Sequence, residues 1–85
     1  MQKIILSINH CETVFLDEQT YEYGSDKEYA TFTKASNAAI KDFDKESMRW
    51  FKESLNRRID IKLKLVDSEF FMIKNIIIKS NGNSL

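Results

Sequence analysis

Residues 57–66, RRIDIKLKLV, contain the clearest structural pattern in the sequence. From residue 59 onward, apolar isoleucine and leucine side chains alternate with charged ones, which is the two-residue period of a strand with one buried face. Residues 70–79, FFMIKNIIIK, form a second run of strand-forming residues. Residues 67–69 separate the two runs. This short connection predicts an antiparallel hairpin.

The segment before this hairpin has the period of a helix. Between residues 36 and 56, apolar side chains recur at spacings of three, four and seven residues, which places them along one side of a helix. These side chains are Ala39, Ile40, Phe43, Trp50, Phe51 and Leu55. Ser36 or Asn37 can cap the first turn, because either side chain can accept a hydrogen bond from a free backbone N–H. We therefore expect one helix over residues 36–56, although the polar run at residues 44–47 also allows a break into two shorter helices.

The first 35 residues predict further strands. Residues 3–8 and residues 13–16 show apolar alternation on either side of a polar break at residues 9–12, which is typical of a hairpin. The other expected elements are a short strand through Tyr21 and Tyr23, a turn at residues 24–26 and a strand at residues 29–33.

These elements together predict an α+β fold, in which a small antiparallel sheet of four to five strands packs on one helix. The expected order is strand, strand, an optional third strand, helix, strand, strand. Hydrophobic residues make up 42% of the chain and charged residues 31%, which is typical of a globular domain. We expect a single α+β domain over residues 1–79 and a flexible C-terminal tail over residues 80–85.

The sequence also bears on cellular location. Its longest apolar runs are far shorter than the roughly 18 residues that a membrane-spanning helix needs, and residues 1–13 lack the long apolar region and cleavage site of a signal peptide. The single cysteine, Cys11, cannot form an internal disulfide, which agrees with a reducing compartment. We therefore expect a cytoplasmic protein without membrane contact. Its preference for isoleucine, lysine and asparagine is common in AT-rich genomes, including those of bacteriophages and low-GC bacteria.

Candidate catalytic and metal-binding residues are scarce. His10, Cys11 and Glu12 are adjacent, but neighbouring strand residues point to opposite faces, and the sequence holds no second histidine or cysteine to complete a usual zinc site. The carboxylates within residues 42–46 fit a solvated helix surface. Two glycines cannot supply most of the known phosphate-binding or calcium-binding loops. We therefore expect no catalytic residue, no metal, no cofactor and no enzyme activity.

The strand expected at residues 70–79 carries apolar side chains in both directions. One face would hold Phe70, Met72, Ile76 and Ile78, and the other Phe71, Ile73 and Ile77. Ile5 and Phe15 also point away from the face that a helix would cover. One helix, about 10 Å across, covers one face of a small sheet. Either residues 17–35 fold back across the second face, or a protein partner or second copy packs there.

The charges are unevenly distributed, although the net charge is zero. Residues 1–35 contain three more acidic than basic residues, and residues 36–85 contain three more basic than acidic ones. The acidic segment at residues 17–28 could contact a basic protein. Basic side chains near the end of the predicted helix are Arg49, Lys52, Arg57, Arg58, Lys62 and Lys64. With Trp50 as a stacking group, they could form a weak, salt-sensitive nucleic-acid site.

Two functional hypotheses follow. The first is a small non-catalytic interaction module, of adaptor or inhibitor type, that binds a protein partner or itself through an apolar sheet face or the acidic segment. Its candidate contact residues are Phe71, Ile73, Ile77, Phe15, Asp17, Glu18 and Glu22. The alternative is a small nucleic-acid-binding regulator that uses the basic patch. The zero net charge favours the first hypothesis, because nucleic-acid-binding domains usually carry a strong basic excess.

Overall fold

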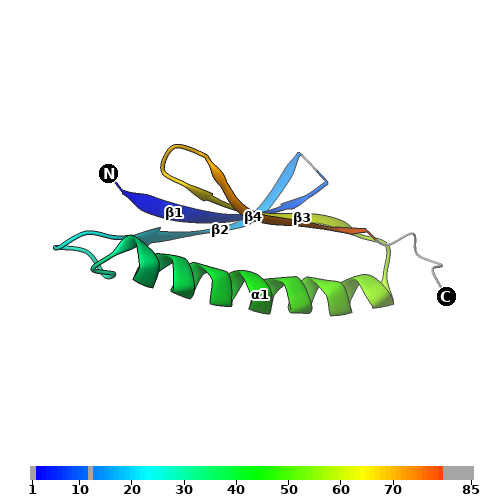
Figure 1. Cartoon of the computed structure of the whole chain (residues 1–85). Coiled ribbons are helices and arrows are strands. Elements are labelled where there is room, and N and C mark those ends of the chain that lie inside the picture. Colours follow the sequence, from blue (N-terminus) through cyan, green and yellow to red (C-terminus); the bar gives the residue numbers. More distant parts are fainter. Residues whose placement is uncertain (1, 12, 80–85) are drawn as a thin grey trace.

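The computed structural model of the protein describes residues 2–11 and 13–79. The elements follow the order β1 (Lys3–His10), β2 (Val14–Glu22), α1 (Phe32–Asn56), β3 (Asp60–Asp67) and β4 (Met72–Lys79). In the described part of the chain, the strands form one antiparallel sheet in the order β2-β1-β3-β4, and α1 lies along one of its faces (Figure 1). The predicted α+β fold is confirmed. The expected tail at residues 80–85 lies outside the described residues.

The hydrophobic core lies between α1 and the sheet. Alternate residues of the two central strands supply most of it: Ile4, Leu6, Ile8, Ile61, Leu63 and Leu65. Leu6 pairs with Leu65, so β1 and β3 present one continuous apolar surface. α1 packs on this surface through Ala35, Ala39 and the buried ring of Phe43. Small alanine side chains let the helix approach the sheet, and each large buried side chain contributes roughly 1.5–3 kcal/mol of transfer free energy.

α1 begins four residues earlier than the apolar period predicts. Thr31 is the N-cap: its backbone is extended, and its Oγ1 accepts a hydrogen bond of 3.2 Å from the backbone N–H of Lys34. Ser36 and Asn37, the predicted caps, lie inside the helix, so that prediction is wrong. Ser36 is buried against the core instead. The capping threonine is followed by residues that can extend the helix, and the apolar period alone does not mark this start.

Residues 23–31 connect β2 to α1 as a loop. Tyr23 and Tyr29 form an isolated bridge, so the strand predicted at residues 29–33 is wrong. The ring of Tyr23 packs edge-on against Phe32, with centroids 5.5 Å apart. The ring of Tyr21 lies 6.3 Å from that of Tyr29. Aromatic packing therefore holds the loop against the beginning of α1.

β2 is one long edge strand, whereas the sequence predicted two short strands at residues 13–16 and around Tyr21. It pairs with β1 over its whole length. Leu16 is an extra residue between Phe15 and Asp17, which forms a β-bulge. Because the strand is largely exposed on both sides, its middle lacks the apolar alternation that would have joined the two predicted pieces.

The predicted apolar stripe of α1 is correct in its first half and wrong near its end. Phe43 is buried and Trp50 packs against the core, but Phe51 and Leu55 are 52% and 56% exposed. The buried position between them is Ser54, whose Oγ donates a hydrogen bond of 2.7 Å to the Phe51 carbonyl. Phe51 directly follows Trp50, and Leu55 directly follows Ser54. Each therefore lies about 100° further around the helix, on its flank.

Candidate interaction surface

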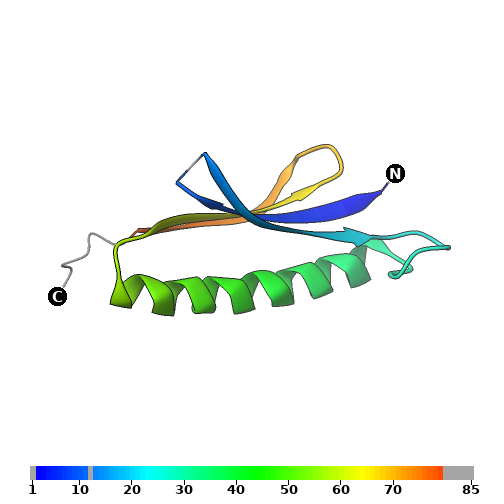
Figure 2. The same cartoon turned by 180° about the vertical axis from the view of Figure 1, so that it is seen from behind.

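The sheet face opposite α1 is open in the described part of the chain. Figures 1 and 2 show no element of residues 2–11 and 13–79 over this face. The loop at residues 23–31 turns toward α1, so the interpretation in which residues 17–35 fold back across the second face is wrong. Phe71 and Ile77 consequently remain exposed.

The open face is mainly polar at its centre. Ser7 lies between Glu18 and Lys64 in the pairing register, and Asn9 lies beside Lys62. A more apolar row crosses the sheet through Thr20, Ile5, Val66 and Met72. The open face as a whole is therefore not hydrophobic, and its exposed apolar side chains concentrate on the edge strands.

β4 separates the three apolar residues that the sequence grouped together. Ile77 lies on the open face and is 55% exposed. Ile73 is the extra residue of a β-bulge opposite the step from Leu65 to Val66, and it packs partly buried against the core. Phe71 precedes β4 and is 66% exposed. The bulge interrupts the strict alternation that was predicted for this run.

The turn between β3 and β4 presents two exposed phenylalanines. Phe70 has φ of 65°, a left-handed conformation that costs a residue with a Cβ atom roughly 1–2 kcal/mol. Its N–H donates a hydrogen bond of 2.9 Å to the Asp67 carbonyl. Oδ1 of Asp67 accepts hydrogen bonds from the N–H groups of Glu69 and Phe71, at 2.9 and 3.0 Å. These bonds hold the turn, which projects both rings into solvent beside the start of β4.

α1 adds a row of exposed apolar side chains beside β4. Asp44 marks the side of α1 that faces β4, because its Oδ1 lies 2.7 Å from Nζ of Lys74 on β4. Met48, Phe51 and Leu55 follow Asp44 by 4, 7 and 11 residues, which places them on the same side of the helix. Each of the three is more than half exposed. The row therefore runs along the β4 side of the helix.

We call this combined surface the β4–α1 edge. It comprises Met48, Phe51, Leu55, Met72, Ile76 and Ile77. Within residues 2–11 and 13–79, β4 pairs with β3 alone, so its other side borders no strand. The sequence interpretation assigned Phe51 and Leu55 to the core and omitted Met48. The spacing of these residues from Asp44 was the signal that could have revealed a second stripe.

The opposite edge of the sheet, β2, is acidic. Glu18 and Glu22 point to the open face and Asp17 to the α1 side, so the predicted acidic residues share one strand but not one face. Behind them Tyr21 is buried, and its hydroxyl donates a hydrogen bond of 2.8 Å to Oδ2 of Asp42. Burial, followed by the hydrogen bond to this carboxylate, raises the pKa of Tyr21. The phenol therefore stays protonated and ties β2 to α1.

The basic side chains predicted to bind nucleic acid do not form one surface. Lys62 and Lys64 lie on the open face of β3, Arg49 and Lys52 lie on α1, Arg57 is its C-cap, and Arg58 follows. Arg49 pairs with Glu46 at 2.8 Å, and its guanidinium carbon lies 4.6 Å from the Trp50 ring centroid. Arg57 pairs with Glu53. The sheet separates the two lysines from the helix cations.

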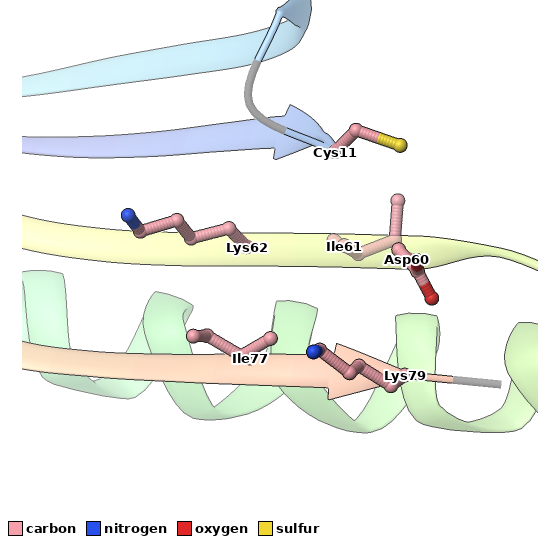
Figure 3. A pocket seen from close by; sticks show the side chains of 6 residues that line it. All are labelled: Cys11, Asp60, Ile61, Lys62, Ile77 and Lys79. Atoms are coloured by element: carbon pink, nitrogen blue, oxygen red, sulfur yellow. The ribbon is translucent and has the colours of Figure 1, made fainter.

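Two shallow hollows lie at the end of the sheet near Cys11. The first, of about 260 Å³, is lined by Cys11, Asp60, Ile61, Lys62, Ile77 and Lys79 (Figure 3). The second, of about 250 Å³, is lined by His10, Cys11, Arg58, Ile59 and Asp60. In Figure 3 the lining side chains spread over the ends of three strands. The described residues contain no group of three or more side chains that could hold a metal ion, and Glu12 lies outside them.

α1, with 25 residues, carries charged side chains along most of its length. No helix within the described ranges, 2–11 and 13–79, is both long enough and apolar enough to cross a lipid bilayer.

Comparisons with models of protein families, with curated proteins and with solved structures found no match to this chain.

Proposed function

We propose that the protein is a small non-catalytic interaction module that binds another protein chain through the β4–α1 edge. One observation carries this proposal: within residues 2–11 and 13–79 the outer edge of β4 pairs with no strand, and it has exposed apolar side chains on both sides, Ile77 on the open face and Phe51 on the helix flank. Such an edge offers backbone N–H and C=O groups to an incoming strand. Burial of the apolar side chains adds about 25 cal/mol per Å².

The β4–α1 edge suits a partner chain better than the other candidate surfaces do. β2 and β4 each carry a bulge, but β2 also carries Asp17, Glu18 and Glu22, whose charges discourage strand pairing at an edge, whereas residues 75–79 of β4 are mostly isoleucine. The basic side chains lie on two sides of the sheet, and this division disfavours the nucleic-acid alternative, which needs concentrated positive charge. The hollows near Cys11 are shallow, and the described residues contain no group of three or more side chains that could hold a metal ion.

Ile77→Glu and Thr20→Glu form a matched pair of variants for testing this proposal. Both residues are exposed, both lie on the open face of an edge strand, and each substitution adds one negative charge. Circular dichroism first establishes that both variants are folded. Tagged wild type and variants are then incubated with nuclease-treated lysate of the source organism, and bound proteins are identified by mass spectrometry.

We expect wild type and Thr20→Glu to retain the same protein, which includes untagged copies of this chain, and Ile77→Glu to lose it. Equal retention by all three would place binding on another surface. Binding that is lost when nuclease is added would support the nucleic-acid alternative instead.

A further inference from the structure

We propose that the chain bound at the β4–α1 edge is a second copy of this protein. The two β4 strands pair antiparallel about a two-fold axis, and the two sheets join into one of eight strands. This inference rests on the proposed function, because it names the occupant of the same surface. Two-fold dimers, in which each copy uses the same patch, are the commonest form of protein self-association.

The side-chain pattern of β4 is compatible with itself. In an antiparallel pair, residues opposite one another point to the same face of the sheet. Lys74 lies on the α1 face of β4, whereas Lys79 lies on the open face. No register of the self-paired strand can therefore place Lys74 of one copy directly opposite Lys79 of the other. The register centred on Ile77 places Ile77 opposite its own copy, Ile76 opposite Ile78 and Asn75 opposite Lys79, and this is the register that we propose.

The helix flank provides the second layer of contact. A partner strand beside β4 would direct its inward residues, Lys74, Ile76 and Ile78, toward the layer that α1 occupies. Ile78 is already buried in its own chain, whereas Ile76 is 38% exposed. Met48, Phe51 and Leu55 line that side of α1 and are exposed in the single chain. Each helix would then cover the exposed part of Ile76 of the other copy. The exposed row on α1 takes no part in the core of the single chain, and in the dimer it would become part of the interface.

The exposed area is close to what a stable dimer needs. The six side chains of the β4–α1 edge are each about half exposed, and at roughly 200 Å² for a large side chain they could bury about 600 Å² per copy. Two copies would thus bury about 1,200 Å², which is the lower limit for specific protein interfaces. Backbone pairing along β4 adds to this area. We therefore expect a reversible dimer whose strength depends on few residues.

β2 is the rival partner for β4, because its carboxylates complement the two lysines. Pairing of β2 with β4 of the next copy would leave a free edge at each end and would propagate into filaments. β4 also has a bulge and an inward charge, at Ile73 and Lys74, but its residues 75–79 are mostly isoleucine. The regular part of β2, residues 17–22, instead includes three carboxylates, which pairing would have to desolvate. Symmetric β4 pairing uses both free β4 edges and closes the assembly.

The first test measures molecular mass by sedimentation equilibrium for wild type, Ile77→Glu and Thr20→Glu. We expect wild type and Thr20→Glu to be dimers at micromolar concentrations, and Ile77→Glu to raise the dimer dissociation constant at least about tenfold. The dimer should persist in high salt, because its contacts are mainly apolar. Wild type that stays monomeric at every concentration up to 100 micromolar would overturn the inference, as would a dimer that Ile77→Glu leaves unchanged.

The second test identifies the paired strands by cross-linking, and it does not depend on how a charged variant folds. In a Cys11→Ser background, the only cysteine is introduced as Ile77→Cys or, as the control, Thr20→Cys. Mild oxidation should link two Ile77→Cys chains within a sedimenting dimer and leave Thr20→Cys chains unlinked. Preferential linkage in a mixture of the two variants would show filament-type pairing of β2 with β4 and overturn the symmetric dimer. If the chain is monomeric and captures a different protein through Ile77, self-association is refuted but the proposed function is preserved. If the chain binds neither itself nor another protein, both proposals are refuted.

Discussion

Lys74 of β4 and Asp44 of α1 form an ion pair that joins the edge strand to the helix, with 2.7 Å between Nζ and Oδ1. Nζ also lies 5.1 Å from the centroid of the Phe43 ring. Lys74 is thus an inward-pointing charge on an edge strand that is otherwise rich in isoleucine. Charges in this position limit strand pairing at sheet edges, because an incoming strand would have to desolvate them. The ion pair therefore restricts the part of β4 that a second chain can use.

Lys74→Met should strengthen association through β4 while leaving the stability of the fold nearly unchanged. Both partners of the ion pair are substantially solvent-exposed, so its loss should change the free energy of unfolding by less than about 1 kcal/mol. Removal of the inward charge should lower the dimer dissociation constant in sedimentation equilibrium. Lys79→Met, which removes a charge from the open face, serves as the control and should have the smaller effect. Weaker association of Lys74→Met would contradict this role.

Phe43→Ala should destabilise the fold by about 3–5 kcal/mol, because the ring is fully buried between α1 and the sheet. Phe51→Ala removes the same side chain from the same helix but from an exposed position. Its cost should be less than about 1 kcal/mol. Urea denaturation at low protein concentration measures both values without a contribution from association. Similar losses for the two variants would mean that Phe51 belongs to the core.

Thr31→Ala should cost about 1 kcal/mol, because it leaves the backbone N–H of Lys34 without its capping oxygen. Ser36→Ala should instead be neutral or stabilising by up to about 1 kcal/mol. The buried Oγ of Ser36 has no hydrogen-bond partner within the described residues, and alanine has the higher helix propensity. Thermal unfolding followed by circular dichroism distinguishes the two. The opposite order would place the start of α1 at Ser36.

Stability should fall at alkaline pH through Tyr21. Burial and the Asp42 hydrogen bond raise the pKa of its phenol above the ordinary value of about 10, so the folded state holds this proton more tightly than the unfolded state does. The resulting stabilisation is fully present below pH 10 and is lost as pH rises beyond it. Urea denaturation between pH 8 and 11, with the same series on Tyr21→Phe, measures this effect. A wild-type slope no steeper than that of Tyr21→Phe would show that Tyr21 does not cause the loss.

The sequence was sufficient to predict the parts of the fold that depend on local side-chain periodicity. Alternation identified β3 because one face of that central strand is buried, and the helical period identified the body of α1 because Ala39 and Phe43 lie against the sheet. It failed at the start of α1, which depends on Thr31 as a cap and on packing between Tyr23 and Phe32. The cap is a local hydrogen bond and the ring packing is a tertiary contact, and neither is periodic in the sequence.

The candidate site was predicted only in part, because its geometry depends on the pairing of strands. Ile77 was correctly assigned to the face away from α1. Ile73 was assigned to the same face, but a bulge, which arises only in register with β3, moves it toward the core. Phe51 was expected in the core because it fits the helical spacing of the apolar side chains. A helix can carry a second apolar stripe, and the sheet width decides which stripe is covered.

Trp50 provides a separate optical reporter of the fold. It is the only tryptophan in the sequence, and it packs against the core with its Nε1 buried. It lies about 100° around α1 from Phe51 and therefore faces away from the β4–α1 edge. Its fluorescence emission should thus shift to longer wavelength when α1 detaches from the sheet, yet remain nearly constant when the edge gains or loses a bound chain. Unfolding and association can accordingly be followed as two independent signals in a single sample.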